Sequence, residues 1–201
     1  NRFYVNGGYK WGYMGIDGTQ VDFHRNAHLA YAGMRYKMSP KAALGGNYVF
    51  QRDQYPFLNS GDTYTLNDVL TQFEIEPIAR LNLEPYYHFQ NFNDASFENS
   101  PAFEPLNDYG DNRVGLNTVY KLTPKLYFLS NSEYQNRSFR KSETKDFHAL
   151  GGKAGLGLQL TRKSYVAGLG GYEKRYFEEG KDADSWLWDL KLNYLPTRRL
   201  N

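Results

Sequence analysis

The sequence predicts an all-β fold: an antiparallel, up-and-down transmembrane β-barrel with about ten strands, built as a single domain over residues 1–201. Three observations lead to this prediction. Polar and apolar residues alternate with period two along most of the chain, as they do in strands whose two faces meet different surroundings. Short connections alternate strictly with longer polar ones. Aromatic residues stand near the ends of the apolar runs, which is typical of the interfacial girdles of barrels in lipid.

The alternation defines ten segments that we expect to be strands. In the first, Phe3 and Trp11 share one face, while Tyr4 and Lys10 share the other. A tight turn is predicted at 15–19, where glycines flank Ile16 and Asp17. The predicted strands are 2–13, 21–37, 42–51, 68–75, 82–91, 113–122, 126–135, 150–160, 165–177 and 186–194.

Three of these segments need a separate argument. In the second, Ala27, Leu29 and Tyr31 are expected on the apolar face, with His28 opposite. The fifth contains Pro85, which has no backbone N–H to donate to a neighbouring strand. We therefore expect a bulge or an unpaired position at that proline. The facing of the ninth, glycine-rich segment stays open.

The connections predict an orientation. Short turns that carry Pro or a basic residue are expected at 38–41, 76–81, 122–125 and 160–164, and longer polar loops at 52–63, 92–112 and 136–145. Outer-membrane barrels have short periplasmic turns and longer extracellular loops, so an even number of strands places both termini on the periplasmic side. A fifth turn at 195–198 lies where another strand would begin. A larger barrel therefore stays open as an alternative.

The composition fits a barrel better than a soluble domain. Aromatic residues make up 17% of the chain, with 18 Tyr and 13 Phe, and there are 19 Gly, yet the mean hydropathy is −0.72. A barrel in lipid needs only every second strand residue to be apolar, so it can span a bilayer while scoring polar overall. The alternative is a soluble sandwich or lipocalin-like barrel. It is disfavoured because such an interior must pack densely, whereas charged residues recur here on nearly every strand.

Several chemistries are excluded or disfavoured. The chain has no Cys, so it has no disulfide and no thiolate site, and its net charge of +2 does not indicate a nucleic-acid partner. His24 and His28 lie about 13 Å apart along a strand, too far to share one metal ion. No metal site and no cofactor are expected. Two period-two pairs near the outer strand ends, Asp22 with His24 and Asp146 with His148, leave an outer-membrane hydrolase as a third alternative, although no Gly-x-Ser-x-Gly signature supports it.

Segments 36–44, 120–126 and 194–201 resemble the turn-and-strand units of outer-membrane β-barrel porins of Gram-negative bacteria. The resemblance runs through the whole chain and is shared with barrels that export exopolysaccharide and with barrels that sheathe multihaem cytochromes. It implies a location in the bacterial outer membrane, surrounded by lipid, and no enzymatic activity. One departure is that such barrels usually end on a strand with an aromatic last residue, whereas this chain ends just past a turn.

The function that this resemblance implies is a channel for ions and passive diffusion of a small polar solute or oligosaccharide. The alternative is a structural or export barrel that works with a protein or polysaccharide partner. The residues predicted to line the lumen are polar-face positions of the strands: Arg2, Tyr4, Lys10, Asp68, Glu74, Glu84, Tyr86, His88, Arg113, Lys121, Tyr127, Glu133, Lys153, Asp189 and Lys191. Tyr4, Tyr86 and Tyr127 could stack on sugar rings. Because a ten-stranded barrel is narrow, these charges either pair and close the lumen or set its selectivity.

Overall fold

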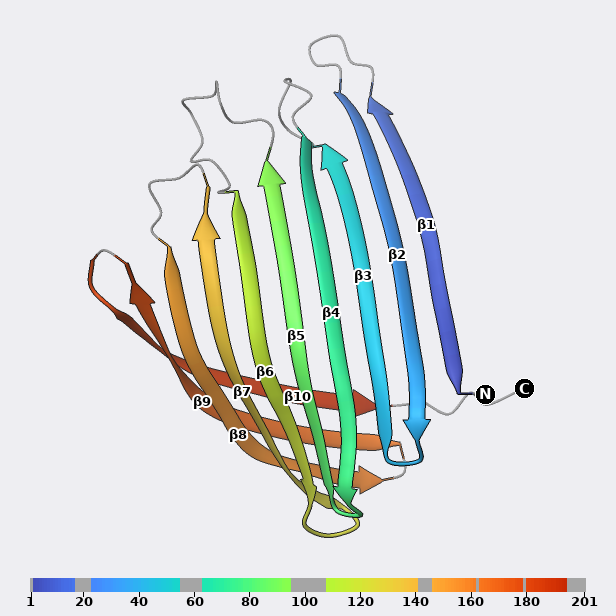
Figure 1. Ribbon diagram of the computed structural model, residues 1–201, viewed down its shortest axis with the longest axis vertical. Coiled ribbons are helices and arrows are strands. Elements are labelled where there is room, and N and C mark those ends of the chain that lie inside the picture. Colours follow the sequence, from blue (N-terminus) through green and yellow to red (C-terminus); the bar gives the residue numbers. More distant parts are fainter. Residues whose placement is uncertain are drawn as a thin grey trace.

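The computed structural model describes residues 2–16, 23–54, 63–94, 108–140, 146–161, 163–178 and 180–194. They form one antiparallel sheet of 10 strands that follow one another in sequence order (Figure 1). The strands are β1 (Phe3–Ile16), β2 (Phe23–Ser39), β3 (Ala42–Gln54), β4 (Thr63–Ile78), β5 (Leu81–Asp94), β6 (Tyr109–Lys121), β7 (Leu126–Phe139), β8 (Phe147–Thr161), β9 (Ser164–Phe177) and β10 (Ala183–Tyr194). The predicted all-β antiparallel architecture is confirmed. Within these residues there is no helix long and apolar enough to cross a membrane.

The sheet is strongly curled but its two edges are not joined. Each strand pairs with its neighbours in sequence, and β1 and β10 each have one partner among the described strands. In Figure 1, β1–β5 run side by side, whereas β8–β10 bend and sweep across the lower part of the view. The described residues therefore form an open, curled sheet. The closure of this sheet into the barrel predicted from the sequence is not seen among them.

The strands extend further toward the long connections than the sequence predicted. β3 continues to Gln54, β5 continues to Asp94, and β6 begins at Tyr109. The predicted turn at 15–19 is partly wrong, because residues 15 and 16 still belong to β1, and 17–19 lie outside the described residues. The short connection after β6 has the predicted bounds, 122–125. Those after β2 and β4 lie within the predicted 38–41 and 76–81 but are shorter, because β2 runs to Ser39, β4 runs to Ile78 and β5 begins at Leu81. Residue 162 of the fourth lies outside the described part.

The expected facing of the second strand is wrong. Pairing with β1 sets Leu29 opposite Lys10 and Ala27 opposite Gly12, so these apolar residues share a face with the lysine. His28 lies opposite Trp11 on the other face. The pattern of β2 was ambiguous because small and aromatic residues occur on both of its faces. Only the pairing with its neighbours fixes which face is which, since a shift of one residue moves every side chain to the other face.

The expectation at Pro85 is confirmed. The ladder between β4 and β5 is interrupted between the pairs Gln72↔Tyr86 and Ile75↔Leu83, which is where Pro85 lies, and a register shift follows between Ile75 and Ile78. On its other side Pro85 pairs in register with Leu116 of β6. A proline is tolerated here because the side without a donor faces the interrupted part of the ladder.

Glycines let β8 and β9 bend. A Cβ atom built on Gly155 would overlap the backbone carbonyl of Gly168, and one on Gly171 would overlap the carbonyl of Gly152. Neither position can therefore carry a side chain without moving the backbone. Glycine at a tight bend of this kind is a common device for curving a sheet. This bend brings Lys153 of β8 within 4.0 Å of Asp189 of β10, across β9.

Candidate functional site

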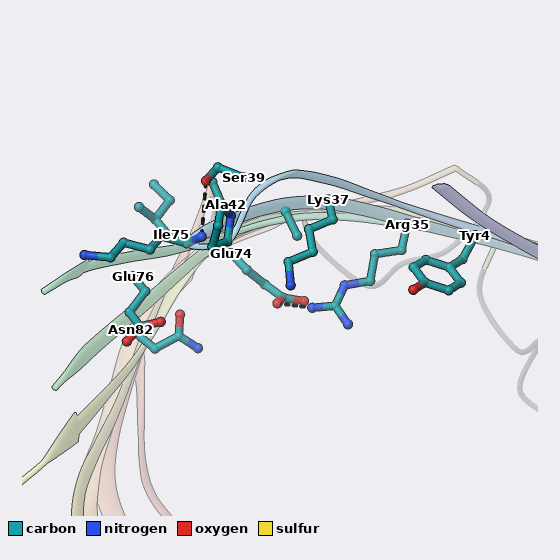
Figure 2. A pocket seen from close by; sticks show the side chains of 12 residues that line it. Tyr4, Arg35, Lys37, Ser39, Ala42, Glu74, Ile75, Glu76 and Asn82 are labelled. Carbon is teal, nitrogen blue, oxygen red and sulfur yellow. Dashed lines mark hydrogen bonds and ion pairs between the residues drawn. The ribbon is translucent and has the colours of Figure 1, made fainter. Parts of the chain in front are cut away.

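The register places every residue predicted to line a lumen on the same face of the sheet. One row of cross-strand neighbours shows this: it runs from Tyr4 through Arg35 and Gln72 to Tyr86 and Glu133. We call this side of the sheet the polar face. Figure 2 shows that Tyr4, Arg35 and Glu74 point to the concave side of the curved strands. The polar face is therefore the inner side of the curl.

The opposite side, which we call the apolar face, carries nearly all of the large apolar side chains that are exposed. Of the exposed large apolar residues in the described strands, Tyr4 and Tyr31 alone belong to the polar face. The rest alternate with the polar residues and cover the convex side from β1 to β10. On β10 this set includes Trp186, Trp188 and Leu190, which are among the most exposed of all. Contiguous exposed apolar surface on this scale marks a region that meets lipid or another protein.

Tyrosines on the apolar face point their hydroxyl groups toward the long connections. The hydroxyl of Tyr48 donates to Oδ1 of Asn67 at 2.9 Å, and that of Tyr87 donates to Oδ1 of Asn112 at 2.7 Å. The hydroxyl of Tyr9 is hydrogen-bonded to Nδ1 of His28 at 2.6 Å. Each partner lies on the same face, one row nearer the long connections. An amphipathic ring with an apolar body and a polar tip is the side chain that suits a boundary between oil and water.

A buried ionic network occupies the polar face between β6 and β7. Its centre is Asp111, whose side chain is 0% exposed. Its carboxylate accepts hydrogen bonds from Nη2 of Arg113 at 2.7 Å, from Nη2 of Arg137 at 2.6 Å, and from Nε2 of Gln135 at 2.8 Å. Arg113 also approaches Glu133 at 3.9 Å. The two arginines and two carboxylates therefore neutralise one another.

The network continues toward the short connections. The Tyr86 hydroxyl donates to Glu133 at 2.5 Å and accepts from the Asn131 amide at 3.2 Å. The same amide donates to Asn117 at 2.9 Å, and Asn117 donates to Glu84 at 3.4 Å. The Tyr86 ring covers Gly115 of β6, where a Cβ atom would overlap it. The Tyr86 ring is thus packed against β6, and its hydroxyl already has two hydrogen-bond partners.

An aromatic layer covers the network on the side of the long connections. The rings of Tyr64, Phe92 and Tyr109 stack in sequence at 5.6 and 5.5 Å. The guanidinium of Arg137 lies over the Tyr109 ring at 4.6 Å, and Phe147 packs beside Phe177 at 5.5 Å. Because both faces of Phe92 and of Tyr109 are occupied by neighbours, these rings act as packing and offer no free stacking surface. The layer helps to bury Asp111, whose side chain is 0% exposed.

The polar face is more open near the short connections of β2 and β4. A cavity of about 400 Å³ is lined there by Tyr4, Arg35, Lys37, Glu74 and Asn82, among others (Figure 2). Nη2 of Arg35 donates to Glu74 at 2.5 Å. Lys37 makes no ion pair with the part of the chain that the structure describes. Tyr4 is exposed, whereas Tyr127 packs edge-on against Tyr165 at 6.4 Å, so Tyr4 has the freest ring of the three tyrosines suggested for sugar stacking.

The residues considered for a hydrolase do not come together where they are described. Asp146 accepts a hydrogen bond from the backbone N–H of Phe139 at 2.7 Å, and the His148 ring stacks on Tyr176 at 5.0 Å. Asp22 and the side chain of His24 lie outside the described residues. Within the described ranges no three His, Asp or Glu residues are grouped so that they could hold a metal ion.

Sequence reasoning missed the centre of the network. Asp111 fell in the predicted loop 92–112, and Arg137 fell in the predicted loop 136–145. A signal was present: the period-two pattern of polar-face residues continues from Arg113 back through Asp111 to Tyr109, and from Gln135 on through Arg137. The Asn and Asp residues of 92–112 and the charged residues of 136–145 suggested loops and hid this continuation.

Comparison with known proteins adds no assignment. The chain matches no family model and no curated protein.

Proposed function

We propose that this chain forms a transmembrane β-barrel in the outer membrane of a Gram-negative bacterium, where it acts as a channel for passive diffusion of small polar solutes. One observation carries the proposal. The strands separate an exposed apolar convex face from a charged concave face, and every predicted lumen residue lies on the concave one. A soluble sheet would place its apolar face inside, where it could be packed.

The height of the apolar band supports a location in the membrane. Along β8 the apolar face is free of polar side chains from Leu150 to Leu160, and His148 follows toward the long connection. Ten residue steps correspond to about 33 Å along a strand. A tilt of about 40°, usual for such barrels, reduces this to about 25 Å, the height of the lipid-facing band of outer-membrane barrels. The tyrosines bonded to His28, Asn67 and Asn112 then lie at its outer boundary.

Closure of the sheet is part of the proposal. Unpaired strand edges are not tolerated in hydrocarbon, because each free N–H and C=O would lack a partner. β1 and β10 run antiparallel to each other, since neighbouring strands alternate in direction through 10 strands. The two edges can therefore pair as neighbours do elsewhere in the sheet. Further strands between them would give the larger barrel that the sequence left open.

The cavity near Arg35 and Lys37 supports a channel over a filled barrel. The Asp111 network fills the concave face only between β5 and β8, whereas the face of β1–β3 carries exposed side chains beside open space. In this open sheet, side chains therefore leave the concave side of β1–β3 uncovered.

Conductance of the purified protein in a planar lipid bilayer tests the proposal. We expect stable, stepwise ion currents, and a protein that needs detergent to stay in solution. An inserted but silent protein would favour the export or sheathing barrel. A monodisperse protein in detergent-free buffer would contradict the membrane assignment itself.

A further inference from the structure

We infer that the channel prefers small anions, because the cations of the polar face project into the concave space while the acidic groups lie against the wall. This inference rests on the proposed channel function and names the class of solute that it would favour. It is carried by the geometry of the ion pairs and by the distribution of cations without a partner.

Several ion pairs of the polar face expose the cation more than the acidic group, whereas the Lys153–Asp189 and Arg113–Glu133 pairs expose both partners about equally. In the pair between Arg35 and Glu74, the arginine side chain is 56% exposed and the glutamate 26%. In the pair between Lys191 and Asp189, the values are 63% and 28%. Arg113 and Arg137 likewise remain partly exposed over an Asp111 that is 0% exposed. In these uneven pairs the long cationic side chain reaches over a shorter acidic one, so positive charge is outermost at those positions.

Cations without an ion pair add to this positive charge. Within the described residues, Arg2, Lys10, Lys37 and Lys121 are exposed polar-face cations with no acidic partner. The acidic groups of this face are less exposed: Asp68 contacts His88 at 3.1 Å, Glu173 contacts Arg175 at 2.7 Å, and Glu84 accepts from the neutral Asn117 amide. Asp68, Glu76 and Glu84 have no Lys or Arg partner among the described residues, and each of them is half-buried. A solute on the concave side therefore meets the exposed cations before it meets these half-buried acidic groups.

The physical consequence is an ion preference of moderate size. Rings or rows of fixed charge in a narrow pore raise the local concentration of the opposite ion, since the protein wall screens less than water does. The preference depends on salt, because the Debye length falls from about 10 Å at 0.1 M to about 3 Å at 1 M. Chloride, small carboxylates and phosphate share the chemistry that such a surface favours.

The test is the reversal potential of the channel in a planar bilayer under a gradient of potassium chloride. We expect a chloride-to-potassium permeability ratio of about 3 or more at 0.1 M, which moves toward one at 1 M as screening shortens the range of the fixed charges. In the double variant Lys10→Gln with Lys37→Gln, the ratio at 0.1 M should fall by about twofold. The control is Lys174→Gln, which removes one positive charge, against two in the double variant, from the apolar face, where Lys174 pairs with Asp182 at 3.6 Å.

The outcomes separate this inference from the channel function. Stable currents with a preference for potassium, or an equal change in the Lys174→Gln control and in the double variant, would overturn the anion preference and leave the channel intact. An inserted protein that carries no current would overturn both. Chloride preference that is lost in the double variant and kept in the control supports the inference.

Discussion

Two regions of the polar face differ in how far their charged side chains are paired and buried. From β5 to β8, Asp111 and its neighbours are neutralised in a continuous network under an aromatic layer, whereas from β1 to β3 the cations are exposed beside a cavity. Both regions follow the same alternation and have charged side chains on the same face. Charged residues on one polar strand face can therefore differ in role: the buried ones link neighbouring strands, and the exposed ones are accessible from the concave side. Substitutions in the two regions should therefore change different properties.

The largest effect is expected from Asp111→Asn. The change leaves Arg113 and Arg137, which are mostly buried, without the fully buried carboxylate that both of them contact. Removing one partner of a buried ion network costs about 3 kcal/mol or more. Urea unfolding of the protein in liposomes, followed by the fluorescence of its three tryptophans, measures this loss. A change below about 0.5 kcal/mol would mean that the network does not stabilise the wall.

The next effect concerns the bend that turns β8–β10 toward the rest of the sheet. Gly171→Ala places a methyl group against the backbone carbonyl of Gly152, which cannot move without shifting the strand. Overpacking of this kind costs about 1–3 kcal/mol. Gly170→Ala is the matched control, because a Cβ atom there meets nothing within 4 Å. The same unfolding assay should show a clear loss for the first variant and little change for the second, and equal effects would contradict the assigned bend.

A smaller loss is expected where tyrosine covers glycine inside the network. Gly115→Ala displaces the Tyr86 ring and breaks its hydrogen bond to Glu133, at a cost of about 1–2 kcal/mol. Gly45 lies in the same cross-strand row but in the other region, where a new Cβ would meet the flexible Gln72 side chain at 3.2 Å. Gly45→Ala should therefore cost less. A reversed order in the unfolding assay would contradict the difference between the regions.

The sequence predicted the sheet better than it predicted the site. Period-two alternation located all ten strands and the polar face on eight of them, because the two faces of this sheet meet different surroundings along most of its length. It left the facing of β9 open. It failed on β2, where the residues that face Lys10 are as apolar as those that face Trp11, so only pairing with β1 decides the facing. It also missed Asp111 and Arg137, since the pairing of two distant segments, and not their composition, makes them one network.

The smallest effect is expected from Glu74→Gln in the open region. Glu74 pairs with Arg35, but the arginine is 56% exposed, and exposed ion pairs contribute about 0–1 kcal/mol. Unfolding should therefore change little. The substitution also removes a negative charge and leaves Arg35 as another free cation at the cavity, so the chloride preference of the proposed channel should rise. Glu74→Gln and Asp111→Asn should therefore be measured together. We expect Asp111 to stabilise the fold, and Glu74 to reduce the positive charge that a solute would meet. A Glu74→Gln protein that unfolds as easily as Asp111→Asn, with unchanged ion preference, would show that the two regions do not differ in this way.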